Sequence, residues 1–216
     1  MKMKKVLLTT AFGLALVGAA ALPAMAQDAG AGFQAGDILV RGRIIDVVPQ
    51  EDSSTSVAGG EVAVGNRVAP ELDFSYFFSE NIAAELILAT TKHELDGKGT
   101  LTGTSIGDAW IVPPTITLQY HFNPDQAFKP YVGAGLNYSW FWNEKPSAAF
   151  NKLEMTGGVG YALQAGFDYK VAENWYFNAD IKKIWLNVDA SINSGGVTAD
   201  VDLDPVVVGV GLGYKF

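Results

Sequence analysis

The feature that most constrains the fold of this chain is an alternation of apolar and polar residues that repeats in eight segments. A β-strand places successive side chains on opposite faces, so alternation with a period of two predicts strands with one apolar and one polar face. In one such segment Ile116 and Leu118 alternate with Thr117 and Gln119. The eight predicted strands span residues 38–48, 70–78, 82–91, 114–122, 128–142, 155–169, 175–186 and 206–216.

The connections between these predicted strands alternate between short and long. The short ones are residues 79–81, 123–127 and 170–174, and the long ones are residues 49–69, 92–113, 143–154 and 189–204. The long connections are polar and contain few long apolar stretches, so we expect loops there. Eight antiparallel strands with both chain ends on the short-turn side are typical of a transmembrane β-barrel with short periplasmic turns and long extracellular loops. Strands of about 9 to 11 residues are long enough to cross the membrane when tilted.

A soluble eight-stranded barrel such as a lipocalin would show the same alternation, with its apolar face turned inward around a ligand. Here the polar face is mostly glycine and charged residues, which suit the narrow interior of an eight-stranded barrel. Aromatic residues make up 12% of the chain and gather at the ends of the segments, as in the girdles at the two lipid interfaces of outer-membrane barrels. These two features favour an all-β barrel in the cell outer membrane over a soluble one.

The N-terminal residues have the pattern of a secretory signal peptide. Three lysines open the chain, a long apolar run follows, and residues 24–26 (Ala-Met-Ala) supply the small residues that signal peptidase accepts. A membrane anchor is the alternative, but a spanning helix needs about 20 apolar residues, and Pro23 fits cleavage better. The sequence therefore predicts a signal peptide over residues 1–26 and an outer-membrane barrel over residues 27–216.

The composition argues against several classes of function. The chain has no cysteine, which removes disulfides, thiolate metal sites and cysteine nucleophiles. Its formal charge is −8, whereas a nucleic-acid-binding domain needs a basic face, so we expect no nucleic-acid partner. Hydrolysis by Ser75 or Ser139 would require His121 and a carboxylate to converge on the serine, and no nucleophile elbow or spacing indicates this. We therefore expect no enzymatic activity.

Two acidic groups are candidate metal ligands, one within residues 93–96 and one at alternate positions of residues 200–204. Carboxylate oxygens suit calcium or magnesium, but neither group has the spacing of an EF-hand. We expect instead a solvated acidic rim that meets the divalent ions bridging surface lipids. The sequence predicts no bound metal and no cofactor.

Charged residues recur on the predicted inward face of the strands, where charges are costly unless paired. We expect five basic and five acidic side chains to cross-link into a polar plug that closes the lumen. An ion pore with selective rings is the alternative, but the interior of an eight-stranded barrel is only wide enough for side chains. The inward residues are Arg41, Arg43, Lys182, Glu71, Asp73, Glu85, Asp168 and Asp180, with Lys129 and Lys215 as further cations.

Pro113 and Pro114 stand at the start of the fourth predicted strand. Proline has no N–H to donate to a ladder and is normally confined to strand edges, first residues or bulges. The pair therefore predicts interrupted pairing at the top of this strand, as at a loop boundary.

Four short strings occur in order along the chain. They are Gly-Asp-Ile-Leu-Val-Arg at 36–41, Pro-Pro-Thr at 113–115 followed by Gln-Tyr-His-Phe at 119–122, Lys-Pro-Tyr-Val-Gly-Ala-Gly-Leu-Asn-Tyr at 129–138, and Leu-Asp-Pro at 203–205 leading into Gly-Leu-Gly-Tyr-Lys-Phe at 211–216. With these strings the chain resembles the outer-membrane protein W family over essentially all of its predicted mature length. The resemblance implies an eight-stranded barrel whose members, including relatives that import alkanes, pass small hydrophobic molecules through a side opening. It implies no reaction chemistry.

The residues and the resemblance together predict a passive outer-membrane channel for small hydrophobic molecules. We expect entry among the external loops and blockage by the charged lumen. The resemblance implies that Pro113 and Pro114 open a lateral gap into the membrane, and a simple loop boundary is the alternative. The apolar residues expected to line the approach to such a gap are Trp110, Ile111, Val112, Phe141 and Trp142. The alternative is a structural or surface-interaction barrel without transport, whose acidic loops bind surface lipids, a host or a phage. The expected partners are outer-membrane lipid and lipopolysaccharide, small hydrophobic solutes, and the barrel-insertion machinery, which by resemblance would read the terminal Phe216.

Overall fold

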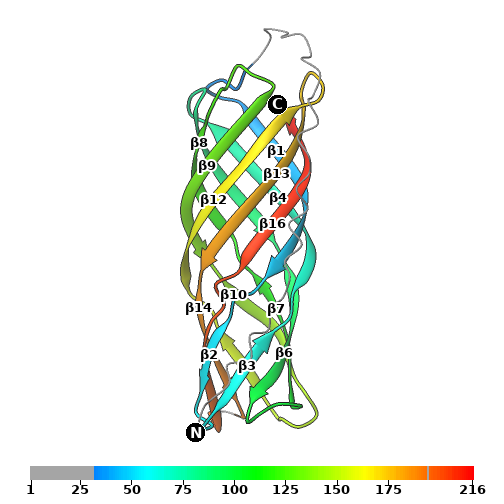
Figure 1. Ribbon diagram of the computed structural model, residues 1–216, viewed down its shortest axis with the longest axis vertical. Helices are drawn as coiled ribbons and strands as arrows, with labels where there is room; N and C mark the ends of the chain where they lie inside the picture. Colours follow the sequence, from blue (N-terminus) through cyan, green and yellow to red (C-terminus); the bar gives the residue numbers. More distant parts are fainter. Residues whose placement is uncertain (1–31, 194) are drawn as a thin grey trace, which may run out of the picture.

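The computed structural model describes residues 32–193 and 195–216, so the predicted signal peptide lies outside the described residues. The described chain is built of β-strands, and eight of them close into an antiparallel barrel (Figure 1). Around the barrel the strand order is β1–β16–β13–β12–β9–β8–β5–β4. These strands are β1 (Ile38–Val48), β4 (Arg67–Phe77), β5 (Ile82–Ala89), β8 (Thr115–His121), β9 (Phe128–Tyr138), β12 (Val159–Lys170), β13 (Trp175–Trp185) and β16 (Val206–Lys215).

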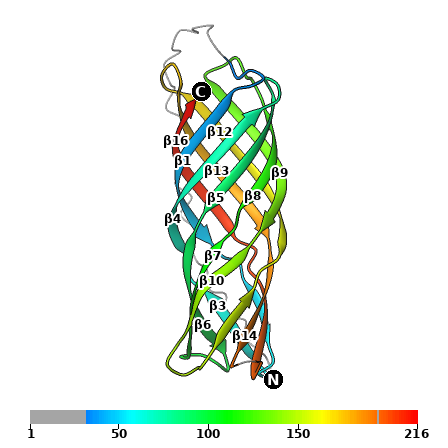
Figure 2. The same ribbon diagram turned by 180° about the vertical axis from the view of Figure 1, so that it is seen from behind.

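The structure differs from the sequence prediction in the four long connections, which are strands and not loops. Beyond the barrel they form two four-stranded sheets, in the orders β10–β7–β6–β3 and β11–β14–β15–β2 (Figure 2). Alternation explains the difference, because every second residue is apolar while the segment as a whole is polar, as with Val188 and Ala190 beside Asp189. These strands are β2 (Asp52–Thr55), β3 (Gly60–Val64), β6 (Thr91–Gly99), β7 (Ser105–Val112), β10 (Trp140–Pro146), β11 (Leu153–Thr156), β14 (Asn187–Ile192) and β15 (Val197–Asp202).

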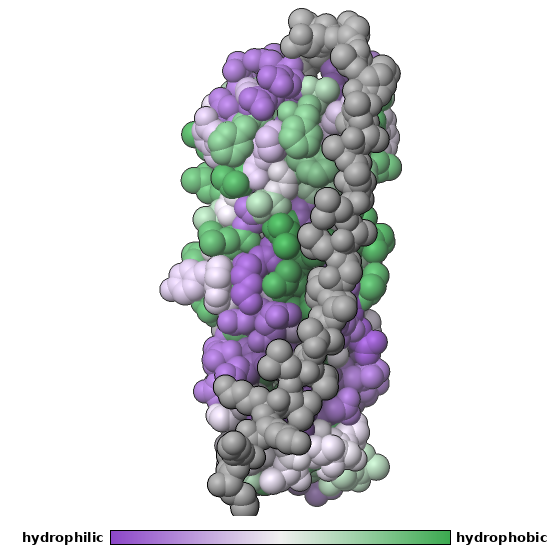
Figure 3. All heavy atoms as spheres, viewed as in Figure 1, coloured by the Kyte–Doolittle hydropathy of each residue, from purple (hydrophilic) through white to green (hydrophobic). Residues whose placement is uncertain are grey.

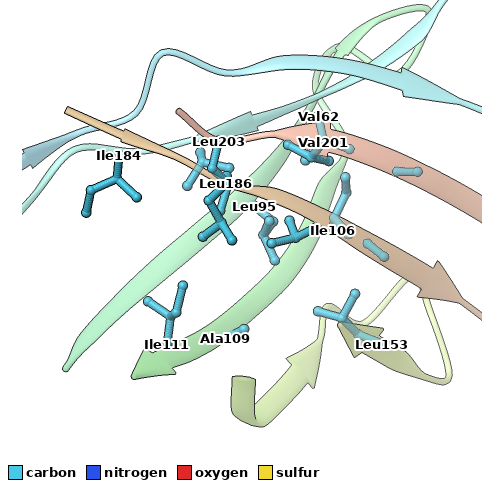
Figure 4. Close-up of a cluster of buried hydrophobic side chains, with 14 of the residues drawn as sticks. Val62, Leu95, Ile106, Ala109, Ile111, Leu153, Ile184, Leu186, Val201 and Leu203 are labelled. Atoms are coloured by element: carbon cyan, nitrogen blue, oxygen red, sulfur yellow. The ribbon is translucent and has the colours of Figure 1, made fainter. Parts of the chain in front are cut away.

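The two outer sheets share an apolar core of their own. Val62, Leu95 and Ile106 contribute from one sheet, and Val201 and Leu153 contribute from the other. Figure 4 shows these side chains pointing into the space between the strands. Because a single hairpin is at best marginally stable in water, this shared core explains how the strands remain ordered beyond the barrel.

The outer face of the barrel strands is apolar. Ile116, Leu118 and Leu136 are each more than half exposed, and Figure 3 shows apolar side chains over the barrel and hydrophilic ones over the outer sheets. Exposed aromatic side chains gather at the end of the barrel that carries the short turns; they are Tyr76, Phe78, Tyr120, Phe122, Phe128, Trp175 and Phe216. This distribution is that of a barrel surrounded by lipid, with an aromatic girdle at one interface. Among residues 32–193 and 195–216 there is no helix of the length and hydropathy that a membrane span requires.

Gly135 on β9 lies where the barrel wall leaves no room for a side chain. A Cβ atom there would come within 1.9 Å of the carbonyl oxygen of Ile116 and 2.7 Å of the Cα of Thr117, both in the backbone of β8. We therefore expect Gly135→Ala to lower the free energy of unfolding by about 1–3 kcal/mol, measured by urea titration of the barrel in lipid vesicles. Gly42→Ala is the matched control, because a Cβ at Gly42 meets nothing within 4 Å. An equal loss in both variants would contradict this explanation.

Candidate functional site

A network of buried charged side chains fills the middle of the barrel. Arg41 on β1 is fully buried, and its guanidinium donates hydrogen bonds of 2.9 and 2.8 Å to the two carboxylate oxygens of Asp168 on β12. The same group donates to Asp73 at 2.8 Å and to Ser75 at 2.7 Å, both on β4. Because β12 is not a neighbour of β1 in the barrel, Arg41 connects strands across the lumen.

Arg43 and Lys182 carry the remainder of the network. The Arg43 guanidinium makes ion pairs of 2.7–3.2 Å with four carboxylates, those of Glu71, Asp73, Glu85 and Asp180. Lys182 on β13 places its Nζ 2.8 Å from Glu71 and 2.9 Å from Asp180. Gln119 and Gln164 complete the network by donating to Glu85 at 2.8 Å and to Asp180 at 3.2 Å. Eight of the ten charged residues predicted to form the plug therefore lie together, and side chains fill the lumen at this level.

The two remaining inward cations lie outside this network. Lys215 pairs with Asp37 at 3.1 Å, and Lys129 donates a hydrogen bond to the backbone carbonyl of Pro124, both at the short-turn end. Their places near the ends of β16 and β9 explain this, since the network occupies the middle of the strands. The network therefore contains three cations and five carboxylates, which corrects the expected balance of five against five.

An apolar cluster closes the lumen between the network and the short turns. Phe33, which precedes β1, is fully buried, and its ring centroid lies 4.2 Å from that of Phe77 and 5.3 Å from those of His121 and Tyr176. The Nζ of Lys129 lies 5.2 Å from the centre of the Phe33 ring. Phe33 was not among the predicted site residues, because it stands before the first alternating strand and no local pattern marks it.

A cavity lies on the other side of the charge network, where the barrel meets the outer sheets. The empty space within it, with its opening to solvent included, is about 890 Å³. The wall is mainly apolar and combines residues of the barrel with residues of both outer sheets, among them Ile45, Ile87, Leu95, Phe141, Met155 and Leu186. Such a cavity fits a small molecule with a large apolar surface.

The polar groups of the cavity are concentrated at its floor. The floor is formed by four residues at the edge of the charge network, Glu71, Lys182, Thr115 and Asn137. His93 on β6 lies in the wall, and its Nδ1 is 3.0 Å from a backbone carbonyl of the β3–β4 connection. Burial lowers the pKa of His93 below its usual value, so the ring is neutral at pH 7 and adds no charge to the wall.

The ladder of backbone hydrogen bonds is interrupted beside this cavity. Strand β5 continues into β6, and β7 continues into β8. These two segments are paired on both sides of the interruption, β5 with β8 in the barrel and β6 with β7 in the outer sheet. The register is the same on both sides, so the strands do not slip past each other. The last pair on the barrel side is Ile87–Thr115, and the first pair on the side of the outer sheet is Thr91–Ile111.

Pro113 and Pro114 explain the interruption. Tyr138 on β9 donates its N–H to the Pro114 carbonyl at 3.0 Å, so the backbone of Pro114 faces β9. The register shared by the pairs on either side of the interruption places Pro113 opposite Ala89. Pro113 has no N–H to donate there, and its carbonyl accepts a hydrogen bond from Nδ2 of Asn137 at 3.0 Å.

The residues predicted to line a path are divided between the two faces of the wall. Pro113 and Phe141 line the cavity, together with Ile111. Trp110 and Trp142 lie opposite each other on the outer face, with ring centroids 5.5 Å apart. Alternation is the reason, because residues beside an inward Ile111 or Phe141 must point outward. Four of the predicted path residues, Trp110, Val112, Pro114 and Trp142, do not line the cavity, and their part in a path through the wall stays a prediction.

The polar side chains considered for catalysis are engaged in other contacts. Ser139, at the cavity end of the barrel, donates to Asn137 at 2.8 Å. His121 lies at the opposite end, within 4.0 Å of Asp168, and Ser75 accepts its hydrogen bond from Arg41. In the part of the chain that the structure describes, no three His, Asp or Glu side chains are placed to hold a metal ion.

Comparison with known proteins identifies the family. Residues 34–216 match the model of the OmpW family. The chain belongs to the OmpW family. It is 34% identical to outer membrane protein W of Vibrio cholerae, over 93% of this chain and 98% of that one. It is 44% identical to an uncharacterised outer-membrane protein of Sinorhizobium fredii, over 86% of this chain and 82% of the other.

A solved structure agrees with this assignment. The crystal structure of the outer membrane protein OprG from Pseudomonas aeruginosa matches with a TM-score of 0.81 and 33% identity, over 86% of this chain and 98% of that one. The present chain is therefore an outer-membrane barrel. Its short turns therefore lie on the periplasmic side, and the outer sheets extend from the cell surface.

Replacing Arg41 by alanine tests the charge network. The change leaves Asp73 and Asp168 buried without their shared cation, which typically costs about 3–5 kcal/mol of unfolding free energy, measured by urea titration in lipid vesicles. Lys92→Ala is the control, because Lys92 pairs with Asp108 in an exposed ion pair of 3.1 Å, worth about 1 kcal/mol or less. An unchanged unfolding midpoint for the Arg41 variant, with unchanged conductance in planar bilayers, would contradict a role in closing the lumen.

Proposed function

We propose that this protein is a passive channel that takes small hydrophobic molecules from the cell surface and releases them sideways into the outer membrane. The molecule enters among the outer sheets, occupies the apolar cavity and leaves through the barrel wall beside Pro113. The observation that carries the proposal is the position of the cavity against this wall. Ala89 and Pro113, which face each other across the interrupted ladder, both line it. Transfer of an apolar solute into lipid is itself favourable, so the step needs no energy source.

The barrel below the cavity is closed at two levels, which supports a lateral exit. The Arg41 network occupies the first level, and the cluster around Phe33 occupies the second. An apolar molecule that entered the network would separate ion pairs without replacing their hydrogen bonds, and a buried charge that loses its partner costs several kcal/mol. The sideways route avoids this cost.

Few hydrogen bonds join the two strands of the barrel wall beside the cavity. Where Pro113 faces Ala89, proline supplies no N–H, and the neighbouring contact is a side-chain bond from the Thr90 hydroxyl to the Ile111 carbonyl at 3.2 Å. Leu88, on the lipid side of the same strand, is exposed. A small separation of the strands here would connect the apolar cavity directly with the apolar membrane.

The name of one relative supports a hydrophobic cargo. The dibenzothiophene metabolism operon protein PahQ of Pseudomonas aeruginosa is 30% identical to this chain, over 74% of this chain and 77% of that protein. Dibenzothiophene is an uncharged aromatic molecule, a chemical class that the apolar wall of the cavity would accept.

A surface-interaction role without transport is the second candidate. The outer sheets project beyond the barrel (Figure 1), and on β2, β14 and β15 acidic residues stand directly opposite each other in the pairs Asp189–Asp200 and Asp52–Asp202. Like charges in this position are unfavourable, so a cationic partner or the divalent ions that bridge lipopolysaccharide would stabilise them. This role leaves the apolar cavity unexplained, and transport therefore remains the first proposal.

Restoring backbone donors beside the cavity tests the lateral exit. In the double variant Pro113→Val and Pro114→Val, up to two ladder bonds can form, each worth about 1 kcal/mol, and valine favours strands. The barrel should stay folded with equal or higher stability, while uptake of a small apolar solute should fall severalfold. The measurement is the rate at which the solute appears in the membrane of vesicles that contain the folded barrel.

The control for this experiment is Pro130→Val, which makes the same chemical change on β9 near the short-turn end, away from the cavity. Its uptake rate should equal that of the unaltered protein. A folded double variant that also keeps the original rate would show that the two prolines are only a strand boundary.

We propose further that the barrel-insertion machinery reads Phe216. Its side chain is 70% exposed at the periplasmic end, and its N–H donates to the Ile38 carbonyl at 2.8 Å. Because that bond is one of many between β16 and β1, the residue contributes little to the finished barrel, and its exposed ring is free for recognition.

Deleting Phe216 should therefore lower the amount of folded barrel in cell outer membranes severalfold, while refolding of the purified chain into lipid vesicles changes little. Phe128→Ala removes another exposed aromatic ring from the same end and should leave insertion in cells nearly unchanged. Equal amounts of inserted barrel for the deletion and the unaltered protein would overturn the proposal.

A further inference from the structure

The floor of the cavity offers more hydrogen-bond acceptors than donors. Asn137 already uses its amide group, donating to the Pro113 carbonyl at 3.0 Å and to Thr115 Oγ1 at 2.8 Å. The Thr115 hydroxyl donates to the same Pro113 carbonyl at 3.1 Å. Of the three N–H groups of Lys182, two are directed to Glu71 and Asp180. The floor therefore has one unused donor, the third N–H of Lys182, and several oxygens that can still accept a hydrogen bond.

Glu71 is the acidic member of this floor. Both of its short ion pairs, with Arg43 and with Lys182, are made by Oε1. Within the described residues Oε2 accepts no hydrogen bond, and Glu71 lines the cavity. This oxygen is placed to accept a hydrogen bond from a molecule that reaches the floor.

The charges beneath the floor are unequal. Three cations face five carboxylates, so the network is formally negative by two charges. Screening is weak in a lumen filled by side chains, and the apolar wall above it lowers the local dielectric. The electrostatic potential at the floor therefore favours a positive group and opposes a negative one.

The outer face of one of the two sheets around the cavity has the same sign of charge. The exposed face of β2, β14 and β15 carries Asp52, Asp189, Asp200 and Asp202. A charged surface of one sign raises the local concentration of oppositely charged molecules. The outer face of this sheet and the cavity floor thus both favour cations over anions.

We infer that the cavity selects amphiphiles, that is, molecules with an apolar body and one hydrogen-bond-donating or positively charged end, such as an alkylammonium ion or an alcohol. The body contacts the apolar wall, and the polar end reaches Glu71. Carboxylates of the same chain length are rejected, because Glu71 and the excess of acids below it repel them. This inference rests on the proposed function, because it assigns a chemical class of cargo to the same cavity.

Three probes with the same eight-carbon chain test it: octylammonium, 1-octanol and octanoate at pH 7.5. The barrel is placed in nanodiscs of zwitterionic lipid, and binding is followed by NMR through labelled methyl groups of cavity residues such as Ile87 and Leu186. Partition of each probe into nanodiscs without the barrel is subtracted. We expect octylammonium to bind at least about tenfold more tightly than octanoate, since a hydrogen bond to a charged group is worth this much, with octanol between them.

A variant assigns the preference to Glu71. Glu71→Gln keeps the shape of the side chain and removes one negative charge, so the ratio of octylammonium to octanoate affinity should fall about tenfold. Glu61→Gln is the matched control, because Glu61 is exposed on β3 and far along the sheet from the cavity floor; its ratio should not change. Folding of each variant is checked by the resistance of the barrel to denaturation on a gel.

The outcomes separate this inference from the proposed function. If none of the three probes shifts the cavity methyl groups, the proposed function itself fails. If all three bind with equal affinity, or octanoate binds best, the cavity still takes apolar molecules but the inferred selectivity is wrong. The order of the three affinities on the unaltered protein tests the inferred selectivity even if Glu71→Gln does not fold. A folded Glu71→Gln variant with an unchanged affinity ratio would show that Glu71 is not the cause of the selectivity.

Discussion

The ion pairs of Arg41 and Arg43 with carboxylates across the lumen determine how the rest of this barrel is organised. Eight strands enclose a space that only side chains can fill, and here that space is filled by charges whose separation would be costly. Arg41 joins β1 to β12, and Arg43 joins β1 to β13. The network thus braces opposite sides of the barrel and divides the molecule into a closed periplasmic part and an open apolar part at the cell surface.

The apolar part depends on this division. The cavity exists because the barrel wall continues above the network into two sheets that turn their apolar residues inward. With the charge network as its floor and the Phe33 cluster below that, the cavity has no axial continuation to the periplasm. Its borders are then the extracellular opening and the lipid-facing wall, and the backbone ladder of that wall is interrupted beside Pro113.

Much of this architecture was predictable from the sequence. Alternation identified all eight barrel strands, and it placed Arg41, Asp73 and Asp168 on the inward face because the two faces of a membrane strand have different chemistry. The long connections follow the same alternation, but their alternate apolar residues, such as Val188 and Ala190, are diluted by aspartates and serines. Their average composition is that of a loop, and only their period is that of a strand.

The sequence by itself thus determined the number of membrane strands, which side of each strand faces lipid, and where the backbone lacks donors. These properties depend on residues that are close together in the chain. The tertiary structure decided the rest: that Lys129 and Lys215 stay apart from the network, that Phe33 closes the periplasmic end, and that Phe141 turns inward while Trp142 turns to the outer face. Closure of the barrel sets these positions, because it brings residues from distant strands to the same height in the lumen, and no local period encodes that height.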